Sequence, residues 1–313
     1  MNNKTQQEVK ELKSKSSQFH DALFQDKIQK DTITNILSNT TNLDRQIIRT
    51  FYKKEYKVPI QDDINSKLSG SLKALTLNMF DLPYEYDARE LHRGLTSIVQ
   101  ENSTIIEILV TRPKSHLSLM REIYKKFYNK PIEQDINNLK SKDFSKFLLL
   151  LLDNERPKER TISTNDAYNI SKEIIKNGIK SYSTDANLFQ NLFLEKSRID
   201  LILISRAFYE LFKKNLYDSI KDETSGGNGQ ILGEILFSTI APSQYFAEKI
   251  KNAIKGLGTD EKTLNRVMVS RSEVDMDIIR EYYFKDWKKT LKEDIKGDTS
   301  GHYGQILMNL SEK

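Results

Sequence analysis

The stretch that decides the fold is Leu291–Gly301, which reads LKEDIKGDTSG. Three other stretches share its pattern of an apolar first residue, an isoleucine at the fifth position and a serine at the tenth. They are Ile60–Gly70 (IQDDINSKLSG), Ile132–Lys142 (IEQDINNLKSK) and Leu216–Gly226 (LYDSIKDETSG). The successive spacings are 72, 84 and 75 residues. Such a register indicates a chain built from four copies of one unit.

Nearly the same spacings, 72, 83 and 76 residues, hold upstream of these stretches. They align four dipeptides, each a polar residue followed by an aliphatic one: Thr32-Ile33, Thr104-Ile105, Asn187-Leu188 and Thr263-Leu264. A register that holds at both ends of a segment shows that the whole segment is repeated, and not one short motif.

The repeated unit is predicted to be helical. Residues 42–56, 103–130 and 273–295 place apolar side chains at i, i+3, i+4 and i+7, which is the period of an amphipathic helix. The chain contains only 6 prolines and 12 glycines. We therefore expect an all-α fold with five helices in each unit and about twenty in the chain. In the last unit, Ser272–Asp275 resembles a capping box that would open the long third helix.

These repeats divide the chain into five segments. We expect a short polar, lysine-rich tail followed by four repeats, with residues 154–166 as the longest connector. The boundaries are 1–15 for the tail and 16–80, 86–153, 166–240 and 244–312 for repeats one to four.

Composition excludes several classes of protein. The longest apolar run, residues 147–152, is too short to span a bilayer, and the polar N-terminus is not a signal peptide. The 313 residues include no cysteine, so no disulfide framework, thiolate nucleophile or Cys-based zinc site can form. The four histidines are scattered, and there is no Walker-type phosphate loop. An enzyme is therefore the least supported interpretation, and we expect an intracellular protein.

The net charge of +5 is unevenly distributed. Residues 1–80 carry 13 Lys and Arg against 9 Asp and Glu, which is most of the excess. A solvated helical surface is the simpler explanation, and attraction to anionic lipid or another polyanion is the alternative.

Repeat four contains the residues of a possible calcium site. Gly256 and Gly258 allow backbone angles that can turn several carbonyl oxygens toward one point. If the helix connections meet at one end of the bundle, Asp298 can complete an oxygen cage. Calcium takes 6–8 oxygen ligands, so places would remain for water or a lipid phosphoryl oxygen. The alternative is that both segments only cap helices.

Three motifs of repeat four carry a resemblance to a known family. Lys255–Asp260 (KGLGTD), residues 269–273 (VSRSE) and residues 297–301 (GDTSG) resemble the fourth repeat of an annexin. The resemblance covers the chain from about Ser16 onward, and it is strongest in repeat four and weakest in repeats one and two. It implies a curved α-helical disc that binds anionic phospholipid through calcium-loaded loops on its convex face.

The resemblance also implies particular residues. In repeat four, the calcium ligands would be the carbonyl oxygens of Ile254, Gly256 and Gly258 and the carboxylate of Asp298. Leu257, within the same loop, would contact the membrane.

Repeat three departs from this pattern in its loop. The resemblance implies ligation by the carbonyls of Gly178, Ser181 and Ser183 with the carboxylate of Glu223. Because serines replace more flexible residues, we expect a weaker calcium site. Tyr182 would sit at the loop tip and contact the lipid interface, which suits an amphipathic ring. An ordinary exposed tyrosine is the alternative.

Repeats one and two lack the acidic ligand. Lys67 and Leu139 occupy the position of Asp298, so we expect no calcium site in either repeat. Lys67 could instead contact a phosphate directly.

Charged residues are also expected between the repeats. Asp87 and Arg112, together with Glu107 and Arg266, match the charged residues of the annexin central channel. Because unpaired buried charge is costly, we predict the ion pairs Asp87–Arg112 and Glu107–Arg266.

Two functions follow from the sequence. The first is a non-enzymatic, cytoplasmic protein that binds anionic phospholipid membranes peripherally, with Ca²⁺ as its cofactor and no nucleic-acid partner. The alternative is a cytoskeletal or scaffold protein with little calcium dependence, resembling the giardins of protists. The loss of ligands in two of four repeats and the basic first repeat motivate this alternative.

Overall fold

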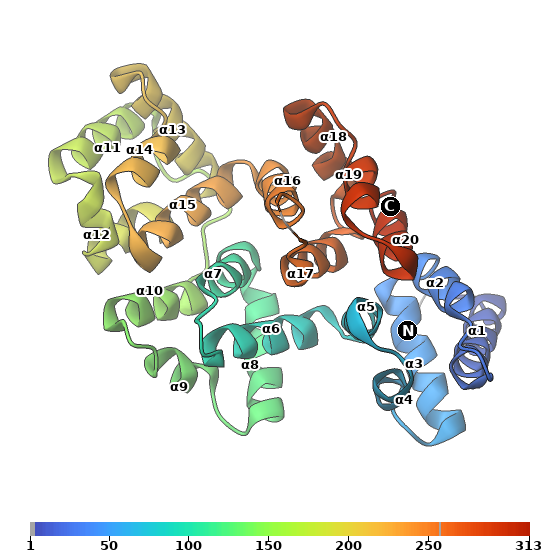
Figure 1. Cartoon of the computed structure of the whole chain (residues 1–313). Coiled ribbons are helices and arrows are strands. Elements are labelled where there is room, and N and C mark those ends of the chain that lie inside the picture. Colours follow the sequence, from blue (N-terminus) through green and yellow to red (C-terminus); the bar gives the residue numbers. More distant parts are fainter. Residues whose placement is uncertain (1–3, 257) are drawn as a thin grey trace. The chain divides into compact units, whose positions relative to one another are not determined.

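The computed structural model describes residues 4–256 and 258–313, and every regular element in these residues is a helix (Figure 1). The prediction of an all-α chain is confirmed. Each repeat contains five α-helices, α1–α5, α6–α10, α11–α15 and α16–α20 in chain order. The helices form two compact units, of which the first is built from residues 1–83 and 246–313 and the second from residues 84–245.

The first unit joins the two ends of the chain. Helices α1 and α3 pack together, and α5 packs against α17 and α20. Its helices are α1 (Gln6–Phe24), α2 (Lys30–Ser38), α3 (Asn42–Tyr56), α4 (Ile60–Lys67), α5 (Gly70–Phe80), most of α16 (Pro242–Ala253), α17 (Glu261–Arg271), α18 (Met276–Trp287), α19 (Leu291–Asp298) and α20 (Gly301–Leu310).

The second unit contains repeats two and three around one apolar core. Helix α15 packs against α7, α10 and α13. The helices are α6 (Pro83–Thr96), α7 (Asn102–Thr111), α8 (Lys114–Tyr128), α9 (Ile132–Asn137), α10 (Lys142–Asp153), α11 (Thr164–Asn177), the 3-10 helix η1 (Ile179–Ser183), α12 (Ala186–Phe189), the π-helical turn η2 (Gln190–Leu194), α13 (Arg198–Phe212), α14 (Leu216–Glu223) and α15 (Gly226–Ile240).

Much of the segment expected to be a tail belongs to the first helix. Thr5 and Glu8 form a capping box, so α1 begins at Gln6 and continues without a break to Phe24. Lys4 Nζ lies 2.6 Å from Asp44 Oδ1 at the start of α3. One capping box and one ion pair therefore fix the start of the helix over residues whose polarity alone suggested a loose end.

One hydrogen bond recurs in three of the four repeats. A tyrosine of the long third helix donates to an aspartate of the short fourth helix, eleven residues later. The pairs are Tyr52–Asp63, Tyr124–Asp135 and Tyr283–Asp294. Repeat three has Phe208 and Ser219 at these positions, so it cannot form the bond. Burial raises the pKa of all three tyrosines, and the aspartate that accepts the bond raises it further.

The predicted capping box at Ser272–Asp275 is wrong. Ser272 has helical backbone angles and ends α17, and Asp275 accepts hydrogen bonds from Arg271 instead. Glu273 accepts bonds from the backbone N–H of Asn42 and from the buried guanidinium of Arg45, at 2.9 and 3.1 Å. The acid therefore links repeats four and one, and α18 begins only at Met276.

Candidate calcium and membrane site

The repeat-four loop lies between α16 and α17 and depends on two glycines. Gly256 has φ 122° and Gly258 has φ 91°, a region that side-chain-bearing residues rarely adopt. Apart from the glycine's own chain neighbours, no atom of the described residues lies within 4 Å of the position that a Cβ would take at either residue. The backbone angle, and not a lack of space, therefore requires glycine here.

Asp298 lies at the end of α19 and faces this loop. The hydroxyl of Thr259 donates to Asp298 Oδ2 at 2.6 Å and to the backbone oxygen of Asp298 at 3.2 Å. The backbone N–H of Asp260 donates to Ala253 O at 2.8 Å, which closes the loop, and Asp260 also caps α17. The structure thus brings the glycine loop and the predicted acid to one place.

These residues fit a calcium ion. Among the residues that the structure describes, none donates a hydrogen bond to the carbonyl oxygens of Ile254, Gly256 or Gly258. Carbonyl and carboxylate oxygens are the ligands that calcium prefers. Within residues 4–256 and 258–313, no cluster of three or more His, Cys, Asp or Glu side chains could hold a metal. A site here would thus rely on backbone carbonyls with one carboxylate. Leu257, the predicted membrane contact, lies outside the described residues.

The repeat-three loop also begins with a glycine of positive φ, but its carbonyl oxygens accept hydrogen bonds from the chain itself. Gly178 has φ 79°, and η1 follows it directly. The carbonyl of Gly178 accepts from Ser181 N, that of Ser181 from Asp185 N, and that of Ser183 from Asn228 Nδ2, at 3.0, 2.8 and 2.8 Å. The three carbonyls predicted as ligands are therefore engaged within the chain.

The acidic residue of repeat three lies near its loop, but no hydrogen bond joins the two in the described part of the chain. Glu223 is exposed at the end of α14, which packs against η1. The hydroxyl of Thr184, which corresponds to Thr259, donates to Ser181 O and not to the acid. Calcium ligation by the repeat-three residues therefore stays a prediction.

The prediction that Tyr182 sits exposed at the loop tip is wrong. Its side chain is 5% exposed and belongs to the core of the second unit, with its ring edge-on to Phe193. Asn177 Nδ2 donates to its hydroxyl at 3.4 Å, and burial raises its pKa. The 3-10 turn directs the ring inward, where burying its apolar face is favourable.

Repeats one and two carry no acid at the ligand position, as the sequence indicated. Lys67 places its ammonium over the ring of Phe24, 4.3 Å from the centroid, and Leu139 is buried. The corresponding repeat-two loop instead exposes Ile98 and Val99 fully to solvent. Sequence reasoning missed this pair, because it considered the loop only as a degenerate calcium site.

Asp87 and Arg112 lie together in the second unit. Arg112 donates from Nε to Asp87 Oδ2 at 2.7 Å and from Nη2 to Oδ1 at 3.0 Å. His116 Nε2 lies 2.7 Å from the same carboxylate, a contact that the sequence did not suggest. Burial alone would raise the pKa of Asp87, but Arg112 and His116 hold it well below its usual value. Glu107 and Arg266 are both fully buried, one in each unit, and their pairing stays a prediction.

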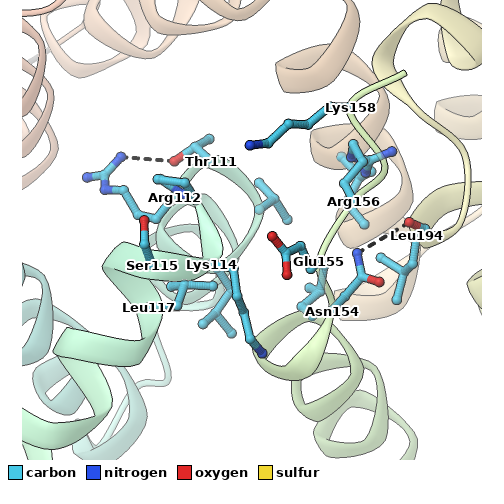
Figure 2. A pocket seen from close by; sticks show the side chains of 15 residues that line it. Thr111, Arg112, Lys114, Ser115, Leu117, Asn154, Glu155, Arg156, Lys158 and Leu194 are labelled. Carbon is cyan, nitrogen blue, oxygen red and sulfur yellow. Dashed lines mark hydrogen bonds between the residues drawn. The ribbon is translucent and has the colours of Figure 1, made fainter. Parts of the chain in front are cut away.

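A recess of about 480 Å³ lies beside the connector between repeats two and three (Figure 2). Lys158 and Glu155 direct their charged ends into it. The connector is held by hydrogen bonds: Asn154 donates to Leu194 O, Arg156 donates to Phe193 O and Lys196 O, and Asp200 accepts from the backbone N–H of Thr161. The segment predicted as a polar linker is therefore anchored along its length.

Comparison with known proteins agrees with the repeat structure. The annexin family model matches residues 16–79, 86–151, 171–232 and 245–310. The chain is 31% identical to annexin A13 of Mus musculus over 278 residues, which cover 89% of this chain and 88% of that protein. No described helix is long and apolar enough to cross a membrane.

Solved structures show the same fold. The structure of annexin III superposes with a TM-score of 0.89 at 30% identity, covering 96% of this chain and 94% of that one. Calcium-bound alpha-14 giardin has a TM-score of 0.79 at 14% identity, covering 97% of this chain and 100% of that one, a likeness of fold alone. Annexins in general bind calcium and anionic phospholipid. With four matched repeats and relatives above 30% identity, the chain belongs to the annexin family.

Proposed function

We propose that this annexin binds anionic phospholipid membranes in a calcium-dependent manner, with the repeat-four loop as its main calcium site. The observation that carries the proposal is the hydrogen bond from Thr259 to Asp298, which holds the carboxylate against a loop containing two left-handed glycines. The carbonyls of Ile254, Gly256 and Gly258 and the carboxylate of Asp298 would hold the ion.

The calcium ion would act as a bridge. Three carbonyls and one bidentate carboxylate supply about five of the 6–8 oxygens that calcium takes. A lipid phosphoryl oxygen can fill a remaining position and attach the protein to the membrane surface. The protein would be a peripheral, cytoplasmic binding protein and not an enzyme.

Repeat three would bind calcium more weakly. Its loop must first release the bonds to the carbonyls of Gly178, Ser181 and Ser183, each worth about 1 kcal/mol net. We therefore expect repeat three to load only at higher calcium concentrations than repeat four.

Vesicle co-sedimentation tests the proposal. Wild-type protein and the variants Asp298→Ala and Glu223→Ala are mixed with phosphatidylserine vesicles over a calcium series. Asp298→Ala should shift half-maximal binding to calcium concentrations at least tenfold higher, whereas the matched control Glu223→Ala should shift it less. Equal calcium dependence of wild type and Asp298→Ala would overturn the proposal.

A cytoskeletal or scaffold role is the second candidate. Lys67 and Leu139 stand where repeat four has Asp298, so half of the repeats lack the acidic calcium ligand. This loss favours a cytoskeletal or scaffold role. Co-sedimentation with actin filaments and microtubules in chelator is the test. Filament binding that is stronger than vesicle binding would support this role, and its absence would reject it.

A further inference from the structure

The loop between α6 and α7 presents an aliphatic pair to solvent. Ile98 is 105% exposed and Val99 is 79% exposed, the two highest values among the large apolar side chains of the described residues. Single exposed apolar residues are common on protein surfaces. Two adjacent ones at a loop tip form an exposed apolar patch, which is typical of a site that contacts a membrane or another protein.

This loop is fixed in place by bonds on both sides of the pair. Arg93 bridges Glu90 and Glu101, with 2.7 Å from its Nη2 to Glu90 Oε2. The backbone N–H of Ser97 donates to Arg93 O at 3.0 Å, and that of Glu101 donates to Gly94 O at 3.3 Å. Because these bonds hold the loop, the exposure of Ile98 and Val99 is built into its conformation.

A polar recess of about 380 Å³ begins where the aliphatic pair ends. Gln100 and Asn102, which follow Val99, form part of its wall. The rest comes from the α9–α10 connection, the repeat-three loop and the start of α15, so four connections of the second unit meet around it. The recess and the aliphatic pair are therefore parts of one continuous surface.

The recess contains groups of both charges. Lys140 and Lys180 supply two ammonium groups, and Asp143 supplies one carboxylate. Asn228 also lines the recess, and its buried Oδ1 accepts no hydrogen bond from any residue in the described part of the chain. Two cations suit a phosphate, while a carboxylate and an unpartnered amide oxygen suit a donor such as an ammonium group.

We propose that Ile98 and Val99 insert into the membrane while the adjacent recess takes the head group of phosphatidylserine, with its phosphate at Lys140 and Lys180 and its ammonium at Asp143 and Asn228, without calcium. The order of the groups matches a bilayer, in which charged head groups lie directly outside the acyl chains. This inference rests on the proposed function because it requires that the protein binds membranes, and it gives the calcium-deficient repeat two a membrane contact of its own.

Vesicle binding in chelator tests the insertion. Full-length wild type, Ile98→Ser/Val99→Ser and Leu119→Ser/Ile199→Ser are compared on phosphatidylserine vesicles in EGTA. The control removes two half-exposed aliphatic side chains of the same unit that lie outside this loop. The loop variant should bind about tenfold more weakly than wild type, and the control should bind like wild type. Wild type that does not bind in EGTA, or a loop variant that binds equally well, overturns the proposal.

The head group is tested by changing the recess and the lipid. Lys140→Ser/Lys180→Ser should lower binding in EGTA by about tenfold. Wild type should bind phosphatidylserine vesicles more tightly than phosphatidylglycerol vesicles of equal charge, because only the former carry an ammonium. Equal binding of the two lipids would reject the assigned head group.

The absence of native cysteine allows a direct measurement of depth. Val99→Cys and Leu119→Cys each accept one environment-sensitive fluorophore. Phosphatidylserine vesicles in EGTA should shift the emission at position 99 to the blue and leave position 119 unchanged. Unchanged emission at position 99 overturns the insertion.

The two proposals fail in different ways. Asp298→Ala should shift the calcium-dependent increment to higher calcium and leave binding in EGTA intact, whereas Ile98→Ser/Val99→Ser should weaken binding in EGTA and leave the calcium concentration at half-maximal increment unchanged. Failure of the first result alone rejects the repeat-four calcium site, and failure of the second alone rejects the repeat-two anchor.

Discussion

Thr259 and Thr184 show how one hydroxyl distinguishes two otherwise similar loops. They occupy the same register in repeats four and three, yet Thr259 donates to the carboxylate of Asp298 and Thr184 donates to Ser181 O within its own turn. The first orientation holds an acid beside open carbonyls. In repeat three, the hydroxyl of Thr184 instead helps to hydrogen-bond the turn to itself. The same residue type therefore positions an acid in one loop and stabilises a closed turn in the other.

We predict that Thr259→Val lowers calcium affinity about tenfold, because residues that orient a metal ligand typically contribute 10–100-fold. Isothermal titration calorimetry of the lipid-free protein measures the effect. Thr259→Ser keeps the hydroxyl and should restore most of the affinity. An unchanged affinity in Thr259→Val would show that the hydroxyl does not position Asp298.

At this scale, the sequence identified the residues that meet at the repeat-four loop better than the conformation of the repeat-three loop. Gly256, Gly258 and Asp298 were identifiable because backbone angle and charge depend on residue type. The burial of Tyr182 was not, because it depends on a 3-10 turn in which Asn228, from another helix, donates to the carbonyl of Ser183. His116 beside Asp87 likewise depends on how α8 packs, which a scattered histidine does not reveal.

At the scale of elements, the third helix of every repeat ends in the same strained way. The residue after it is left-handed and is never glycine: Lys57, Asn129, Lys213 and Lys288 have φ of 62°, 54°, 55° and 55°. Glycine is preferred at such helix ends because it lacks the Cβ that makes this region unfavourable. The three ends at Lys57, Lys213 and Lys288 were invisible in the sequence because lysine, unlike asparagine, is not a turn signal.

Lys213→Gly should therefore stabilise the protein by roughly 0.5–1 kcal/mol, as relief of the left-handed strain exceeds the entropy that glycine adds to the unfolded chain. Urea unfolding followed by circular dichroism checks the value. Lys214→Gly, at a neighbouring residue without a left-handed φ, is the control and should not stabilise. A loss of stability in Lys213→Gly would contradict the account.

The tyrosine–aspartate bond makes α18 and α19 sensitive to acid. Partial burial alone would raise the pKa of Asp294, but hydrogen bonds from Lys251, Lys289 and Tyr283 hold it at about 2. A carboxylate with a depressed pKa stabilises the fold above its unfolded pKa of about 3.9, and the stabilisation is lost as the pH falls through 2.

Asp294→Asn should consequently lower the free energy of unfolding by about 2 kcal/mol at pH 6. The difference from wild type should shrink steadily between pH 4 and pH 2. Urea unfolding across this range is the measurement, and a difference that stays constant down to pH 2 would exclude the charged form of Asp294 as the cause.

Most elements were predictable because the repeat register and the helical period are local signals. The exception at Ser272 has a local cause: Asp275, the acid of the predicted capping box, accepts hydrogen bonds from Arg271, and Ser272 keeps helical backbone angles at the end of α17. The sequence pattern of a capping box was present, but another partner for the acid prevailed.

At the scale of the whole molecule, four sequential repeats become two units that do not follow chain order. Repeats one and four form one unit, and repeats two and three form the other. A repeat pattern predicts the number of modules but not which of them share a core, because that depends on long-range packing. One consequence is that the repeat-four and repeat-three loops belong to different units.

Calcium should therefore protect the two units unequally. In hydrogen–deuterium exchange, calcium at a concentration that loads repeat four should slow exchange in residues 254–260 and 296–301, because bound ligand stabilises the closed loop. Residues 178–185 should change less, since their carbonyls are already bonded. Equal protection of both loops at low calcium would contradict the ranking of the two sites.

A crystal structure of this protein in calcium is the most direct test of the repeat-four calcium site. We predict that a calcium ion occupies the repeat-four loop, bound by the carbonyls of Ile254, Gly256 and Gly258 and the carboxylate of Asp298, and that repeats one and two hold none at these loops. An empty repeat-four loop in crystals that hold calcium in another repeat would contradict it.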